Sequence, residues 1–178
     1  IVERTVNGST IKALELMDNE YHVDSAAKYT NGSPTKTWTI SHLPNTEVIV
    51  KSGNYSMGTY TTNGSGQLTL TEAVSSVEIG LDFTPELTTL PPEFQLPDGI
   101  SVGQKRRIVR AVLDLNEALN VKTRGTTLLI RRVTDDFSLE PVAVTSRKEV
   151  YLLGWSSEGT VTITQDQPLP LTINGILL

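Results

Sequence analysis

Short apolar runs, alternating with polar residues and separated by turn-forming residues, dominate residues 37–83. Apolar side chains recur at every second position in three places: Val48 and Val50, Leu68 and Leu70, and Val77 and Ile79. Clusters of Asn and Gly lie between these runs, and residues 63–66 carry the plainest hairpin signal. A period of two broken by turn residues is typical of half-buried strands. The stretch therefore predicts a small β-barrel or sandwich module.

The segments on either side of this module also predict strands. We expect residues 1–36 and 84–178 to form an outer antiparallel sheet or sandwich that residues 37–83 interrupt, in a mostly β chain with little helix. Asn7-Gly8 predicts a tight hairpin turn near the start. Residues 26–34 predict a loop, with its turn at residues 31–34.

Residues 105–121 fit two structures. Ile108, Val112, Leu115 and Leu119 recur at helical spacing. Val109, Ala111, Leu113 and Leu115 instead share one face of a strand. The pattern alone predicts an amphipathic helix, and a long strand is the competing interpretation.

Composition excludes several classes of protein. The net charge of −5 is unfavourable for general binding to nucleic acid or to an anionic membrane surface. No run of apolar residues approaches the roughly 20 residues of a membrane helix. The absence of cysteine excludes disulfides and thiolate metal sites. The chain starts without Met and ends on an apolar INGILL, so we expect it to be a piece of a longer chain.

No constellation of residues predicts catalysis. His22 and His42 have no third ligand spaced around them, so we expect no metal site, and His42 is expected to be a turn residue bonded to backbone. Asp135-Asp136 and Asp166 are interpreted as turn acids. Phosphate-loop, dinucleotide, nucleophile-elbow and zinc-protease motifs are all absent. We therefore expect neither an enzyme nor a cofactor.

Basic side chains form the most distinctive charge pattern. On a long strand they would follow one stretch of surface and line a lumen or meet an acidic neighbour. The alternative is a solvated strand edge protected from aggregation. These residues are Lys105, Arg106, Arg107, Arg110, Arg131 and Arg132.

Seven short motifs occur in a distinctive order along nearly the whole chain. They are VERTVNG, HVDSAAKY, ISHLPNTEVIV, SSVEIGLDF, LTTLP, GQKRRIVRAVLDL and ITQDQPLPLTINGILL. This order resembles the C-terminal part of the nozzle proteins of short-tailed bacteriophages, also called tail tubular protein B or tail stabilisation proteins. The resemblance favours a strand over residues 105–121.

The resemblance implies a structural subunit of the virion without catalytic activity. Such a protein assembles in the host cytoplasm into a homo-oligomeric ring of the phage tail, contacts other tail proteins and lets DNA pass during ejection. No membrane is involved. The alternative function is a carbohydrate- or receptor-binding β module, in which aromatic side chains would provide stacking surfaces. The candidates are Trp38, Tyr55, Tyr60 and Trp155.

Overall fold

The computed structural model describes residues 1–93, 95–96, 99–100 and 105–178. Within these residues the chain forms strands and irregular segments and no helix, which confirms the mostly β fold. The described sheets are open and antiparallel, and none closes into a barrel. The chain divides into two compact units. Unit 1 comprises residues 1–83, 137–141 and 167–169, and unit 2 comprises residues 84–136, 142–166 and 170–178.

A hairpin begins unit 1. Strands β1 (Val2–Val6) and β2 (Ser9–Ala13) pair antiparallel, with Val6 opposite Ser9. Asn7 and Gly8 have φ angles of 48° and 74°. Two consecutive positive φ values are those of a type I′ turn, whose twist matches the flanking strands. The hairpin predicted at Asn7-Gly8 is confirmed.

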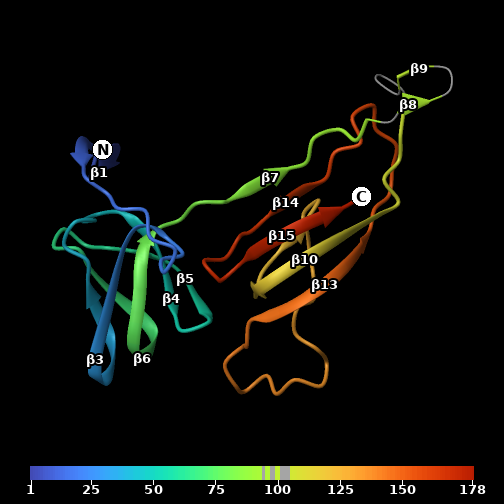
Figure 1. Cartoon of the computed structure of the whole chain (residues 1–178). Helices are drawn as coiled ribbons and strands as arrows, with labels where there is room; N and C mark the ends of the chain where they lie inside the picture. The colour runs from blue at the N-terminus through green and yellow to red at the C-terminus, as the bar shows by residue number, and fades with distance from the viewer. Residues whose placement is uncertain (94, 97–98, 101–104) are drawn as a thin grey trace. The chain divides into compact units, whose positions relative to one another are not determined.

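A four-stranded sheet forms the rest of unit 1. Its strands are β3 (Asp24–Thr39), β4 (Glu47–Ser52), β5 (Tyr55–Thr61) and β6 (Gln67–Leu81), in the order β3-β6-β4-β5. The long strands β3 and β6 lie side by side (Figure 1). Alternate residues of the strands face one apolar core, as the period of two predicts. The core consists of Val6, Trp38, Ile40, Leu43, Val48, Val50, Leu68, Leu70, Val77 and Ile79.

The loop predicted over residues 26–34 is wrong, because these residues lie inside β3. Thr30 pairs with Ser76 and Thr35 with Val74, so residues 31–34 of β3 lie opposite a single residue of β6. The turn-forming residues are accommodated as a bulge between two paired stretches. Pro34 is tolerated there because β3 is an edge strand of the sheet.

Strand β3 also crosses the boundary predicted between residues 36 and 37. It pairs with β6 from Asp24 to Thr39, so its hydrogen bonds join both sides of that boundary to one sheet. The structure accordingly groups residues 1–36 with residues 37–83 instead of with residues 84–178.

The turn predicted at residues 63–66 forms, but the two strands it joins are not neighbours. β5 pairs with β4, whereas β6 pairs with β3 and β4. Gly66, at φ 76°, accepts a hydrogen bond of 2.8 Å from the backbone nitrogen of Ile40. The turn thereby directs the chain across the sheet to begin β6 beside β3.

Unit 2 contains two sheets that share one core. In the first, β10 (Arg110–Ala118) lies between β13 (Val144–Tyr151) and β15 (Thr172–Leu177). The second has the order β12 (Thr126–Thr127), β11 (Lys122–Thr123), β14 (Thr162–Thr164) and β7 (Glu86–Thr88). A separate pair is formed by β8 (Gln95–Leu96) and β9 (Gly99–Ile100). The buried core residues are Ala111, Leu113, Leu115, Ala118, Val121, Ile130, Leu152, Val161 and Ile163.

The strand favoured for residues 105–121 is confirmed over Arg110–Ala118. Ala111, Leu113 and Leu115 are fully buried, and they alternate with more exposed residues as a half-buried strand requires. Pairing with strands on both sides outweighs the helical spacing of Ile108, Val112 and Leu115. Lys105 and the following four residues precede the strand.

Candidate interaction surface

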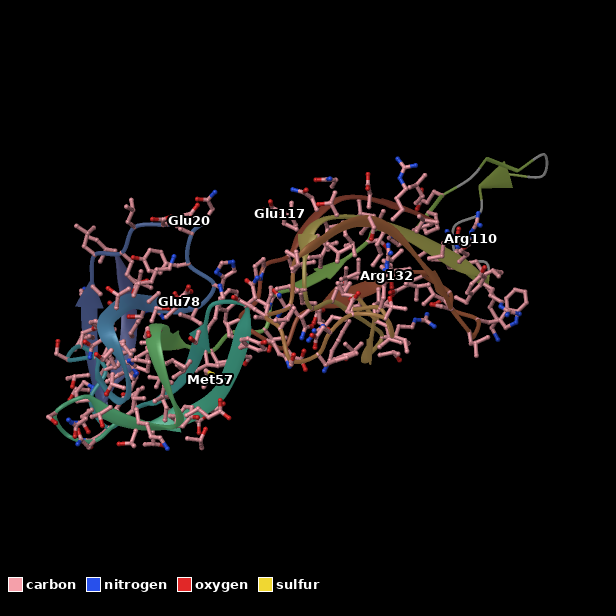
Figure 2. The ribbon with its side chains drawn as sticks, turned by 90° about the horizontal axis from the view of Figure 1, so that it is seen from below. Glu20, Met57, Glu78, Arg110, Glu117 and Arg132 are labelled. Atoms are coloured by element: carbon pink, nitrogen blue, oxygen red, sulfur yellow. The ribbon has the colours of Figure 1, made fainter. Side chains whose placement is uncertain are left out.

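The six basic residues singled out from the sequence all lie in unit 2, but only Arg110 belongs to a strand of the main sheets. Lys105 and Arg107 are exposed in the segment that leads into β10. Arg131 and Arg132 lie in the connection between β12 and β13. Figure 2 shows Arg110 and Arg132 on different parts of the unit. The six side chains therefore do not form a single row.

Arg106 packs within unit 2 instead of extending into solvent. Its backbone exchanges hydrogen bonds of 2.8 and 2.9 Å with Ser156, and its Nη1 donates to the carbonyl of Pro92. The aliphatic part of the side chain lies against Gly159, where a Cβ atom would come within 2.6 Å of the Arg106 Cδ. Arg106 thus holds the start of the β10 segment to the segment after β13.

Arg110 lies on the outward face of the β13-β10-β15 sheet. Its Nη1 is 3.5 Å from Glu149 Oε1, and on the same face Arg147 Nε is 3.8 Å from Asp114 Oδ1. Arg110 remains more than half exposed. Exposed ion pairs of this kind contribute about 0 to 1 kcal/mol, so Arg110 is available to a partner at small cost.

Arg131 and Arg132 belong to a turn. Arg131 Nη2 donates to the carbonyl of Asp136 at 2.7 Å, and the backbone nitrogen of Arg132 donates to Asp135 Oδ2 at 2.7 Å. The Asp135 carboxylate and the backbone carbonyl of Asp136 thus both take part in closing the turn that contains them.

Exposed aromatic and aliphatic side chains lie next to the basic segment. Tyr151 is 70% exposed, Leu153 77% and Trp155 70%. Tyr151 is opposite Arg110 in the β10–β13 ladder. The Arg106–Ser156 bridge likewise places Trp155 and Arg107 on neighbouring segments. We name the group formed by Arg107, Arg110, Tyr151, Leu153 and Trp155 the aromatic–basic patch.

The sequence identified only part of this patch. Trp38, another of the stacking candidates, is 6% exposed and belongs to the core of unit 1. Tyr151 and Leu153 were missed. The signal that would have revealed them is the alternation of Tyr151, Leu153 and Trp155, three large side chains at every second position, with buried Leu152 between them.

A buried charged cluster in unit 1 was also missed. Glu78 is 5% exposed and Lys51 7%, and they are paired on adjacent strands, with Lys51 Nζ 3.8 Å from Glu78 Oε2. Lys51 Nζ also lies 2.9 Å from His22 Nδ1, and the backbone nitrogen of His22 donates to Glu78. The cluster fixes the segment before β3 to the sheet.

The protonation of the cluster follows from its surroundings. Burial raises the pKa of Glu78, but hydrogen bonds from His22 and the charge of Lys51 outweigh burial and hold the pKa below its usual value. Burial lowers the pKa of Lys51, and the charge of Glu78 opposes this only in part. His42, in contrast, bonds the carbonyl of Ser25 at 2.9 Å, the backbone contact expected for it.

Asp166 does more than terminate a strand. It accepts hydrogen bonds from Lys122 and, at 3.0 Å, from Asn120 Nδ2. The bond from Lys122 lowers the pKa of Asp166, although partial burial opposes the change. This carboxylate ties the segment after β14 to the one that contains β11.

Unit 1 also has an open groove with a volume of about 660 Å³ between β5 and β6. Tyr55, Met57, Thr71 and Val74 line it, together with Glu140, which accepts a hydrogen bond of 2.6 Å from the backbone nitrogen of Asn54. The groove's ionisable lining side chains are Tyr55, Glu72 and Glu140.

Among the described residues, no group of three His, Asp or Glu side chains is placed to hold a metal ion. No helix in that part of the chain is long and apolar enough to cross a membrane. In comparisons with known proteins, no protein-family model matches the chain, and no curated protein is significantly similar to it.

Proposed function

We propose that the chain is a structural subunit of a bacteriophage tail, of the nozzle or tubular-ring type. The single observation that carries the proposal is the order of the seven motifs, which resembles the order in that family. Both units expose large apolar side chains next to charged residues. Exposed patches of this kind mark interaction surfaces, which supports a protein that assembles with others. In this role the protein is not an enzyme.

The proposed partners are further copies of the same protein in a ring and neighbouring tail proteins, with DNA passing through the ring. Lys105, Arg107, Arg110 and Arg132 are the basic residues whose exposure suits a lumen or an interface. The protein would be located in the virion after assembly in the host cytoplasm.

Electron microscopy of the full-length parent protein, alone and in purified particles, tests this function. We expect rings from the isolated protein and density at the tip of the tail, with the protein detected in the particle by mass spectrometry. A monodisperse monomer that is absent from purified virions would refute the proposal.

A second candidate function, binding of carbohydrate or of a receptor, is favoured by the exposure of Tyr151 and Trp155. Sugars stack on exposed aromatic rings, and Trp155 would then change its fluorescence on titration with the ligand. Screening the chain and its Trp155→Ala variant on a glycan array separates the two candidates. Binding that is lost in the variant would favour the second function, and no binding at all would remove it.

A further inference from the structure

Residues 14–20 of unit 1 expose apolar side chains among acids. Leu14 is 88% exposed, Leu16 89% and Met17 100%. The same segment carries Asp18 and Glu20, both exposed. Nothing in the described part of unit 1 covers the three apolar side chains. We name these seven residues the acidic segment.

The acidic segment is held in place even though it has no regular secondary structure. Glu15 forms an ion pair with Arg4, which also contacts Asp24 at 2.6 Å. Because Leu14 and Leu16 flank Glu15, anchoring this residue leaves the two leucines to face solvent.

The far end of the segment is fixed as well. The backbone nitrogen of Glu20 donates to Asp18 Oδ1 at 2.9 Å, and Lys28 Nζ donates to the carbonyl of Glu20. The side chain of Glu20 extends away from the ribbon of unit 1 (Figure 2). A segment that is already ordered loses little conformational entropy on binding.

The aromatic–basic patch of unit 2 has the complementary chemistry. Tyr151, Leu153 and Trp155 offer apolar surface, and Arg107 and Arg110 offer positive charge. Arg107 forms no ion pair with any described residue. Trp, Tyr and Arg are the residues most enriched at energetically dominant interface positions.

We propose that the acidic segment of one copy of the chain docks on the aromatic–basic patch of a second copy. Leu14, Leu16 and Met17 cover the aromatic surface, while Asp18 and Glu20 approach the two arginines. The charges of the units suit this pairing. Unit 1, which presents the acidic segment, is acidic overall with ten acidic and five basic residues, whereas unit 2 has ten of each and does not repel it.

The contact is heterologous, since the two surfaces differ and lie on different units. Heterologous contacts build closed rings or open helical filaments, never isolated symmetric dimers. The inference rests on the proposed ring function and names the residues that would join neighbouring subunits.

Mixing two defective variants of the full 178-residue chain tests the contact. The segment variant carries Leu14→Ser, Leu16→Ser and Met17→Ser, and the patch variant carries Leu153→Ser and Trp155→Ala. All five residues are exposed, so we expect both variants to unfold at the temperature of the parent. Leu129→Ser, at another exposed leucine of unit 2, is the matched control.

Sedimentation equilibrium over a range of protein concentration measures the association. We expect each defective variant to associate about thirtyfold more weakly than the parent, as loss of a dominant interface residue implies. The equimolar mixture should form a one-to-one complex, because one intact segment and one intact patch remain. The control should associate like the parent.

Nuclear magnetic resonance gives a second readout from the two tryptophans of the chain. On raising the concentration, the indole N–H signal of Trp155 should shift, whereas that of Trp38, buried in unit 1, should not. Substituting both arginines by Glu should remove the shift, and adding Asp18→Lys and Glu20→Lys should restore it.

The inference would be overturned by a parent chain that stays monomeric at every concentration or by association that neither set of substitutions weakens. Defective variants that do not combine, or a Trp155 signal that does not change with concentration, would also overturn it. Binding of nucleic acid to the patch, without self-association, would also count against it. Rings that persist in both variants refute this contact alone. Absence of the parent protein from virions refutes the proposed function alone.

Discussion

The substitution Glu78→Gln in the buried cluster of unit 1 should be strongly destabilising. Gln has the size of Glu and keeps an oxygen for the backbone nitrogen of His22, so the change removes little besides the negative charge. Lys51, buried and 3.8 Å away, then loses its counter-charge.

The magnitude follows from this distance. Two unit charges 3.8 Å apart attract by about 4 kcal/mol at an effective dielectric constant of about 20. Breaking one partner of a buried ion pair typically costs about 3 to 5 kcal/mol, because a buried charge is left uncompensated. Lys28 Nζ, 3.9 Å from Glu78, is partly exposed and adds little. We expect unit 1 to lose about 3 to 4 kcal/mol of its free energy of unfolding, a large share of a typical domain's 5 to 15 kcal/mol.

Urea unfolding monitored by tryptophan fluorescence provides the assay. In a Trp155→Phe background, Trp38 is the sole tryptophan and reports on the core of unit 1. Glu72→Gln is the matched control, because Glu72 is an exposed residue of the same strand. Its effect should stay within about 0.5 kcal/mol.

A second variant separates loss of the ion pair from loss of packing. Lys51→Met together with Glu78→Gln removes both charges, so no buried charge is left without its partner. We expect this double variant to lie within about 1 kcal/mol of the parent. The reasoning fails if Glu78→Gln is as mild as the control, or if the double variant is no more stable than Glu78→Gln alone.

Three further changes have defined outcomes. The pKa values of Glu78 and Asp166 are lowered in the folded chain, so both carboxylates stabilise it above about pH 4. This stabilisation is lost as the pH falls through the lowered pKa values. The urea concentration at the midpoint of unfolding should therefore drop steeply in acid for the parent chain and less steeply for Glu78→Gln. Gly66→Ala should cost at least about 2 kcal/mol on the Trp38 signal, because a Cβ at φ 76° would overlap the carbonyl oxygen of Ile40. Leu113→Ala should cost about 2 to 5 kcal/mol in unit 2, seen as faster amide exchange in β10, with the Trp38 transition unchanged.

Local signals were sufficient for part of the fold. Asn7-Gly8 encodes its hairpin through two residues that accept positive φ, and the alternation from Val48 to Val50 places both on the core face. Such features depend on neighbours in sequence, so the residue pattern alone predicts them.

Pairing between distant strands determined the rest. Residues 31–34 contain turn formers, yet β6 pairs on both sides of them and absorbs them as a bulge. Lys51 and Glu78 become neighbours only through the register of β4 against β6. A single sequence does not show the register in which distant strands pair, so it could predict neither the bulge nor the buried ion pair.

The alternation of Tyr151, Leu153 and Trp155 groups these large side chains, but the sequence does not say whether they are exposed. Trp38 and Trp155 both follow strand-like residues, but one lies in the core and the other points to solvent. Trp38 lies within β3 on the face that the core of unit 1 covers, whereas Trp155 lies outside the strands, four residues after the end of β13. Packing between distant segments also decides which arginines are exposed, because Arg106 lies against Gly159 whereas Arg107 is exposed.

The proposed heterologous contact makes a last prediction about the size of the assemblies. After one contact, each pair of copies still has one free acidic segment and one free patch, so growth continues until the ends meet or the copies run out. A segment variant retains its patch and can therefore bind one growing end without offering a new one. Adding it in increasing proportion to the parent chain should shorten the assemblies progressively in sedimentation velocity. An isologous contact would give dimers whose size is independent of this proportion, which would contradict the heterologous arrangement.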